Sequence, residues 1–390
     1  MIKSFSKLFL ASFLIILSCM GLARFAFGMV LPNMQSDLHI STTVAGLIGS
    51  ANFAGYFVGI IFASKIYSHF RTTPLISICL FLQGLTMILM ALADNYFIIC
   101  ILYFLTGFLA AILNIAIIVY LSHAIPNKIR GKALGIAVSG NGVGIIFSGL
   151  LVPYLEQFYQ TNSWRVSWIV FSLIIIVISF SIKYLLTYDV DHSVKSDVKF
   201  YSYIKNKNFW KIGSLYFFFG ISYVVYVTFF VSAAIDKWNL SSQISGMFWS
   251  TFGFICIFGG FLFGIIADKY GTFKTLILVF GFQAFSIFIL IFNTPSFALF
   301  VSVFFFAISV WSVPTMITIL CTEFFGLKKT AQVFSLVTLL FAIGQIIGPL
   351  AAGYIHDTFK SYDYVFFMTF VLSFFGFISS IIFSYKKITI

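Results

Sequence analysis

The sequence predicts an all-α membrane protein with twelve transmembrane helices in two six-helix, pseudo-symmetric halves. Of its 390 residues, 61% are hydrophobic and only 9% are charged, whereas a soluble domain carries about 25% charged residues. The apolar residues form twelve runs of roughly the 20 residues that a bilayer requires. The basic residues gather in every second connection between these runs. A soluble fold and a disordered chain are both excluded by this composition.

The twelve apolar runs are continuous and lack a period-two alternation, so they predict helices rather than the strands of a β-barrel. The first run is too long for the apolar part of a signal peptide, and we interpret it as a retained helix. In chain order, the predicted helices are 8–32, 43–64, 74–93, 96–121, 133–155, 165–187, 209–233, 244–267, 275–292, 296–321, 331–354 and 364–384.

The connections between the predicted helices are short, with one exception. Residues 188–207 form the most polar stretch of the chain and contain several acidic and basic residues. This stretch divides the sequence after the sixth helix. We therefore expect an N-terminal bundle over 1–187, a cytoplasmic central loop over 188–207 and a C-terminal bundle over 208–390.

The basic residues predict the orientation of the chain. With the N-terminus in the cytoplasm, 19 of the 23 Lys and Arg residues fall on the cytoplasmic side, three fall on the opposite side, and Arg24 lies within a helix. Basic residues are enriched in cytoplasmic connections of membrane proteins. Both termini are therefore expected in the cytoplasm. The net charge of +12 is explained by topology, and no nucleic-acid partner is expected.

Acidic and cysteine residues give no sign of a catalytic or metal site. None of the 11 acidic residues lies in the middle of a predicted helix, and the five Cys residues lie in or beside apolar runs without a paired spacing. Such cysteines are typical of small buried apolar residues. We expect no cofactor, no metal and no enzymatic activity.

The two halves contain an internal repeat. Residues 55–71 (GYFVGIIFASKIYSHFR) and 259–274 (GGFLFGIIADKYGTFK) both end the second helix of a half and enter a short basic connection. Their offset is about 204 residues. Two repeated bundles joined by a polar connection are typical of transporters that work by alternating access.

The second copy of this repeat resembles a motif of the major facilitator superfamily. The stretch GIIADKYG (264–271), followed by Lys274, is similar to the pattern Gly-x-x-x-Asp-Lys/Arg-x-Gly-x-x-Lys/Arg of that superfamily. Trp164-Arg165 and GQIIGPLAAG (344–353) extend the resemblance along the chain. The segments at 22–38 and 219–231 are most similar to the bacterial YbfB/YjiJ-like group. The resemblance implies a multi-pass transporter of the bacterial inner membrane, working as a monomer.

The resemblance also implies a gate at the cytoplasmic side. In the superfamily, this motif pins the cytoplasmic helix ends of the opposite half. That role carries over to Asp268, Lys269 and Lys274, with Arg130 as the expected partner. The first-half copy departs from the pattern because Ser64 stands where the superfamily usually has Asp.

Arg24 is the strongest candidate for contact with a solute. A cation in the middle of a membrane helix costs about 2.5–3.5 kcal/mol on insertion scales, so it normally faces a cavity or a partner. A guanidinium can bind a carboxylate through two parallel hydrogen bonds. Arg24 is therefore either the counter-ion of an anionic solute or a structural tie to helix carbonyls or to an acid at the outer side.

Other polar residues recur at helical spacing on the predicted helices. In the superfamily, the first, fourth, seventh and tenth helices line the central cavity, and Tyr103 stands where many members have Arg. A single buried amide is also a common tie between membrane helices. With Arg24, the candidate solute-binding residues are Asn52, Tyr103, Asn114, Asn141, Tyr223, Tyr226, Trp311 and Gln345.

We therefore expect a secondary active transporter that moves a small organic solute, anionic or zwitterionic, by alternating access. The alternative is a proton-coupled exporter of drugs or metabolites. Protons as the coupling ion are an open possibility, with Asp37 or Glu323 as carriers, and a uniporter or an anion exchanger is equally open. No connection offers the catalytic carboxylates or metal ligands that a membrane enzyme would need.

Overall fold

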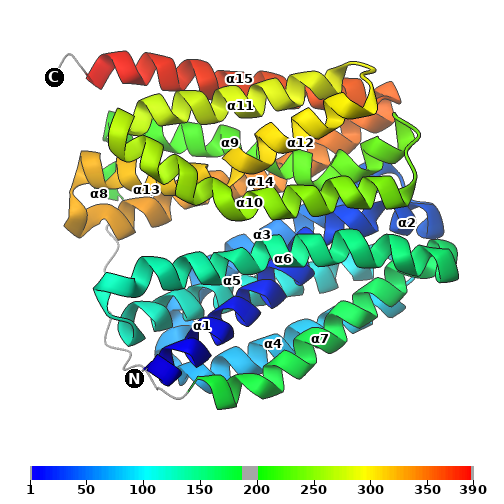
Figure 1. Ribbon diagram of the computed structural model, residues 1–390, viewed down its shortest axis with the longest axis horizontal. Helices are drawn as coiled ribbons and strands as arrows, with labels where there is room; N and C mark the ends of the chain where they lie inside the picture. The colour runs from blue at the N-terminus through cyan, green and yellow to red at the C-terminus, as the bar shows by residue number, and fades with distance from the viewer. Residues whose placement is uncertain (1, 187–200, 388–390) are drawn as a thin grey trace.

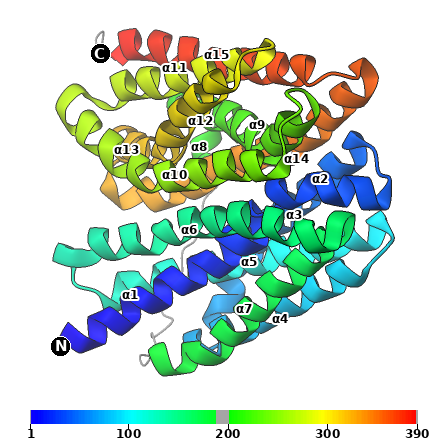
Figure 2. The ribbon, with the colours of Figure 1, turned by 45° about the vertical axis from the view of Figure 1, so that its right-hand side comes forward.

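The computed structural model describes residues 2–186 and 201–387, and within these ranges the regular structure is helical. Residues 2–186 form one bundle and 201–387 form a second bundle beside it (Figures 1 and 2). Most of the predicted central loop, up to residue 200, lies outside the described residues, and its end forms the short helix α8 (Tyr201–Ile204). The all-α membrane fold that the sequence predicts is thereby confirmed.

The helices of the first bundle are α1 (Ile2–Ile16), the π-helix η1 (Leu17–Phe25), α2 (Phe27–Leu38), α3 (Thr42–His69), α4 (Thr72–Leu92), α5 (Tyr96–Ala124), α6 (Asn127–Tyr159), the 3₁₀-helix η2 (Gln160–Asn162) and α7 (Ser163–Leu185). Those of the second bundle are α9 (Lys207–Asp236), α10 (Ser242–Tyr270), α11 (Thr272–Ile291), α12 (Ser296–Val310), α13 (Ser312–Phe325), the 3₁₀-helix η3 (Leu327–Lys329), α14 (Thr330–Phe359) and α15 (Tyr362–Lys387).

Eleven segments of the described chain are long and apolar enough to cross a membrane. One of them, Ile129–Leu185, has 57 residues and contains both α6 and α7. The first predicted helix corresponds to α1, η1 and α2 together, and the tenth corresponds to α12 and α13. The number of twelve crossings stays a prediction.

Two ends of the molecule are distinguished below. Both termini and α8 lie at one end, which we name the terminal end, and we name the opposite end the far end (Figure 1). The turns before α3 and α10 lie at the far end. In these two turns, His39 and Asn239 have the same left-handed φ of 51°. Ser41 and Ser241 then accept hydrogen bonds from the third backbone N–H of the helix that follows, which is a common N-terminal cap. The repeat found in the sequence is thus visible in local geometry.

The tenth predicted helix is interrupted at Trp311, which separates α12 from α13. Pro314 lies four residues after Val310, the last residue of α12. A proline removes one N–H donor and its ring collides with the carbonyl four residues earlier. The break therefore has a local cause in the sequence, and it leaves Trp311 at the centre of the span.

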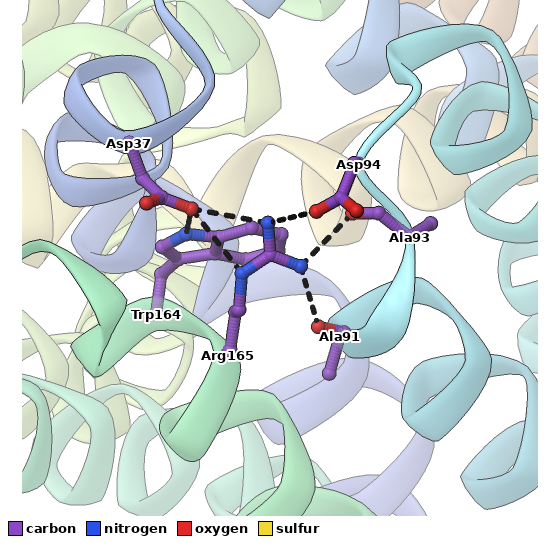
Figure 3. A network of polar contacts seen from close by, with 6 residues as sticks. All are labelled: Asp37, Ala91, Ala93, Asp94, Trp164 and Arg165. Atoms are coloured by element: carbon purple, nitrogen blue, oxygen red, sulfur yellow. Dashed lines mark hydrogen bonds and ion pairs between the residues drawn. The ribbon is translucent and has the colours of Figure 1, made fainter.

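Arg165 ties the first bundle together at the far end (Figure 3). Its guanidinium contacts the Asp37 carboxylate of α2 at 3.1 Å and the Asp94 carboxylate at 2.7 Å. It also donates to the carbonyls of Ala91 and Ala93, where α4 ends, at 2.9 and 3.0 Å. Cations are favourable at the C-terminus of a helix because the last carbonyls lack partners. One side chain of α7 therefore joins α2 and α4.

Lys237 has the corresponding role in the second bundle. Its ammonium donates to the carbonyls of Leu290 and Ile291, where α11 ends, at 2.8 and 2.9 Å, and it pairs with Asp363 of α15. Burial lowers the pKa of Lys237, and the hydrogen bond and charge of Asp363 oppose that shift. The order of the charges along the chain differs between the halves. In the first bundle the acid, Asp37, comes before Arg165, whereas in the second bundle Lys237 comes before the acid, Asp363. Each bundle thus has its own charged contacts between helices at the far end.

Small residues bring the two bundles together in the middle and at the far end. A Cβ atom added at Gly46 would lie 2.2 Å from the carbonyl oxygen of Pro349, and one at Gly246 would lie 2.2 Å from that of Gly149. These contacts join α3 to α14 and α6 to α10. Towards the terminal end, a Cβ added at Gly135 or Gly264 would have no atom within 4 Å. The close backbone contacts between the bundles therefore lie away from the terminal end.

This difference predicts opposite effects of two equivalent substitutions. Gly46→Ala should lower the melting temperature of the purified protein, because the added methyl group collides with backbone on α14. Gly264→Ala should leave it unchanged or raise it slightly, because alanine favours a helix over glycine by about 0.5–1 kcal/mol. Thermal unfolding in detergent is the measurement, and an equal response of the two variants would contradict the packing described.

Arg165 also gives a prediction. Arg165→Ala should destabilise the protein by about 1–3 kcal/mol, because two carboxylates and two carbonyls lose a charged donor. Arg165→Lys should recover part of this loss, since an ammonium keeps the charge but not the planar fork. The melting temperatures of the three proteins test the order. If Arg165→Ala melts like the unsubstituted protein, the tie has no energetic role.

Candidate functional site

Arg24 lies in the π-helix η1, in the middle of the first apolar segment. Single π-turns within α-helices occur frequently at functional sites. The side chain is 5% exposed. Its guanidinium carbon lies 4.3 Å from the ring centre of Phe53 and 4.1 Å from that of Tyr56, both on α3. The negative face of an aromatic ring attracts a cation, so these two rings stabilise the buried charge without neutralising it.

The hydrogen bonds of Arg24 are few and long. One terminal nitrogen lies 3.5 Å from the amide oxygen of Gln345, and the other lies 4.0 Å from the sulfur of Met20. The third nitrogen, Nε, is buried without a partner. Within the described residues, no carboxylate lies within ion-pair distance of this guanidinium. A guanidinium has five N–H donors, so most of its capacity to bind an anion is unused.

Gln345 connects the two bundles at this point. It accepts from Arg24 of the first bundle and donates from Nε2 to the Tyr223 hydroxyl at 3.3 Å, and Tyr223 belongs to α9 of the second bundle. The hydroxyl of Tyr103 donates to the backbone carbonyl of Arg24 at 3.2 Å. The Asn52 amide in turn donates to the carbonyl of Tyr103 at 3.1 Å. These contacts hold the main chain of η1 and the residues around it in a single polar network.

Aromatic rings complete the wall around Arg24. Trp311, at the break between α12 and α13, meets Phe25 of the first bundle edge to face at 5.1 Å between ring centres. Tyr223 lies 5.8 Å from the same Trp311 ring. Asn114 donates to the Tyr56 hydroxyl at 2.8 Å and so fixes one of the two rings that cover Arg24. The site therefore combines one cation, several amides and hydroxyls, and flat apolar surfaces.

The far side of this site is closed. A small pocket beside Arg24 is lined by residues of both bundles and has a volume of about 10 Å³, which is room for about one water molecule. One turn further towards the far end, a Cβ atom added at Gly28 would lie 2.2 Å from the carbonyl oxygen of Val227. A solute could not reach Arg24 from the far end in this state.

Seven of the nine candidate solute-binding residues are connected to Arg24 through these contacts: Arg24, Asn52, Tyr103, Asn114, Tyr223, Trp311 and Gln345. Tyr226 lies elsewhere, with its hydroxyl 3.1 Å from Ser302 and its ring stacked on Phe306 at 3.8 Å, within the second bundle. Asn141 is buried in α6 with its amide oxygen unpaired and has no described contact to the network.

The sequence reasoning missed Phe53 and Tyr56, which cover the guanidinium. They follow Asn52 by one and four residues on α3, so helical spacing places Tyr56 on the same side as Asn52. The abundance of aromatic residues, 20% of the chain, hid this signal.

The expected gate residues are separated in this structure. Arg130 donates to the backbone carbonyl of Ser122 at 2.5 Å, in its own bundle. Asp268 is exposed at the end of α10, and no contact between it and Arg130 is found in the described part of the chain. Lys269 lies over the ring of Tyr270, and Lys274 is exposed. The pairing of Asp268 with Arg130 stays a prediction for another state of the protein.

Comparison with known structures places the fold. A bacterial homologue of the human lysosomal transporter Spinster, in an inward-facing and unoccupied conformation, superposes with a TM-score of 0.80 at 15% identity, covering 97% of each chain. The nucleoside transporter NupG superposes with a TM-score of 0.78 at 12% identity, again covering 97% of each chain. These TM-scores show a shared fold. Among curated protein sequences, none matches this chain.

The family comparison covers nearly the whole chain. The sequence profile of the family described as "Uncharacterised MFS-type transporter YbfB" matches residues 16–380. Its match includes η1, the α3–α14 contact and the Arg24 network described above. The YbfB-like resemblance inferred from residues 22–38 and 219–231 is thereby confirmed. The chain belongs to the YbfB family of the major facilitator superfamily, and it is a multi-pass membrane transporter and not an enzyme.

Proposed function

We propose that this protein is a secondary active transporter for a small anionic or zwitterionic organic solute, with Arg24 as the counter-ion of the solute's negative group. The observation that carries the proposal is the buried guanidinium, whose Nε is unpaired and whose two hydrogen bonds to described residues are long. A carboxylate brought to its edge would accept two charge-assisted hydrogen bonds, which are roughly twice as strong as neutral ones.

The orientation follows from the charge distribution. Since the predicted topology assigns 19 of the 23 basic residues to the side of the termini, we infer that the terminal end faces the cytoplasm and that the membrane is the bacterial inner membrane. The close contacts between the bundles at the far end then form the outer closure, so that the state described is closed to the outside. A cycle that alternately opens each end would carry the solute past Arg24, in a protein that acts as a monomer.

The two acids considered for proton coupling both have partners. Asp37 accepts from Trp164 at 2.9 Å and pairs with Arg165, and Glu323 accepts from the Thr272 hydroxyl at 2.6 Å. Neither lies in the Arg24 network. The transport measurement below, with and without a pH gradient, tests proton coupling. It also tests the alternative of a proton-coupled exporter of drugs or metabolites.

Transport in proteoliposomes tests the proposal. The panel contains small carboxylates, zwitterions, neutral compounds and amines, each with and without a pH gradient. Arg24→Ala should reduce carboxylate transport about 100-fold, on the scale of a lost charged hydrogen bond of 1.5–3 kcal/mol. Arg24→Lys should retain part of it, and Lys183→Ala, which removes an exposed cation outside the network, should retain all of it. Transport of amines alone, driven by protons and insensitive to Arg24→Ala, would support the exporter instead.

Two variants of Gln345 test directly whether the Arg24 guanidinium is free to bind an anion. Gln345→Glu places a carboxylate where the amide oxygen now lies, 3.5 Å from Arg24. This internal carboxylate should occupy the anion site, abolish carboxylate uptake and raise the melting temperature, because it pairs a buried charge. Gln345→Ala should keep measurable uptake, since it leaves Arg24 free. Equal uptake by the two variants would show that Arg24 does not bind the anionic group.

A further inference from the structure

Asp357, in the last turn of α14, lies at the boundary between the bundles. Its carboxylate accepts from the backbone N–H of Thr42 at 3.2 Å, from the N–H of Thr43 at 2.7 Å and from the Thr43 hydroxyl at 2.5 Å. Thr42 and Thr43 are the first two residues of α3. Asp357 belongs to the second bundle and α3 to the first, so these three hydrogen bonds cross the interface.

The chemistry of this contact suits a reversible closure. The first N–H groups of a helix have no partner within the helix, and the helix dipole favours a negative charge there. Next to Asp357, the backbones of the two bundles touch: a Cβ atom added at Gly353 would lie 2.3 Å from the carbonyl oxygen of Thr42. The carboxylate can reach the N-terminus of α3 only while the bundles are in contact here. Opening the far end would separate all three hydrogen bonds at once.

The other charged ties at the far end lie within one bundle. Arg165 joins α7 to α2 and α4, and Lys237 pairs with Asp363 of its own bundle. Among the contacts of the described residues, Asp357 makes the charged contact that crosses between the bundles at this end. On the same helix, Nδ1 of His356 lies 3.7 Å from the Asp357 carboxylate.

We propose that Asp357 is the gating residue that holds the outer end closed, and that its release from α3 accompanies opening to the outside. The inference rests on the proposed orientation and transport cycle. The Asp357 carboxylate, bound to the N-terminus of α3, holds the outer end closed. The glycines at the interface determine how closely the two bundles approach each other.

A cysteine reporter tests this gate. Thr228 is 3% exposed and lines the small pocket beside Arg24, behind the far-end closure. Thr228→Cys should therefore react slowly with a membrane-impermeant maleimide applied outside intact cells. Adding Asp357→Asn should raise the labelling rate roughly tenfold, on the scale of a lost hydrogen bond to a charged group. Protein without the reporter cysteine gives the background from the native cysteines.

Asp363→Asn is the matched control, because it removes an acid at the same end whose partner lies within the second bundle. It should leave the labelling rate unchanged. If Asp357→Asn leaves the rate unchanged in protein that still elutes as a single folded species, the gate is wrong. Should that variant fail to fold, Thr43→Val removes one of the three donors and should give a smaller rise in labelling. An unchanged rate there would equally overturn the proposal.

The same assay separates this inference from the proposed function. Labelling is measured without solute, so it does not depend on the anion specificity of Arg24. In inverted vesicles, the reporter should react faster than in intact cells, and Asp357→Asn should slow that reaction. If the rise caused by Asp357→Asn appears in inverted vesicles and not in cells, the gate exists but the orientation is reversed, and the assignment to the outer end is wrong.

Discussion

A buried cation, beside which the described part of the chain places no carboxylate, is the constraint on which the centre of this protein depends. Burial of an arginine costs free energy unless contacts compensate it. Here the compensation comes from the faces of Phe53 and Tyr56, the amide dipole of Gln345 and the sulfur of Met20. These groups lower the cost without removing the positive charge. An anionic solute would supply the missing partner, and the elements that hold the compensating groups come from both bundles.

Other charged side chains of the protein bind the ends of helices. Arg165 and Lys237 bind the C-terminal carbonyls of α4 and α11, while Asp357 binds the N-terminal N–H groups of α3. In each case the charge of the side chain is opposite in sign to the partial charge of the helix end that it binds. The two cations act within a bundle and make it rigid, whereas the anion acts between bundles. A rigid pair of bundles, joined at the far end by the charged contact that Asp357 makes among the described residues, is what rocking of one repeat against the other requires.

The sequence predicted the features that follow from hydropathy and from charges in an apolar chain. Helical spans, the repeat and the isolation of Arg24 all depend on such local signals. Asp357 was not recognised, because a lone acid beside a predicted helix end resembles any other outer acid until α3 is placed next to it. Tyr223 and Tyr226 lie three residues apart on α9, yet one meets Gln345 and the other meets Ser302 and Phe306. Helical spacing fixes a side of the helix, and only the neighbouring helices decide what that side contacts.

The same two helices, α3 and α14, contribute residues to both the site and the proposed gate. On α3, Thr42 and Thr43 hold Asp357, and Phe53 and Tyr56 cover Arg24; on α14, Gln345 contacts Arg24 and Asp357 contacts α3. Gln345 and Asp357 are separated along one continuous helix by about 18 Å, at 1.5 Å per residue. An anion that replaces Gln345 at Arg24 removes a contact between α14 and η1 near the centre. Because α14 contains both residues and is unbroken between them, a rotation of α14 against α3 that follows this loss also acts on the far-end contact. Coupling between solute binding and the gate thus needs only η1, α3 and α14.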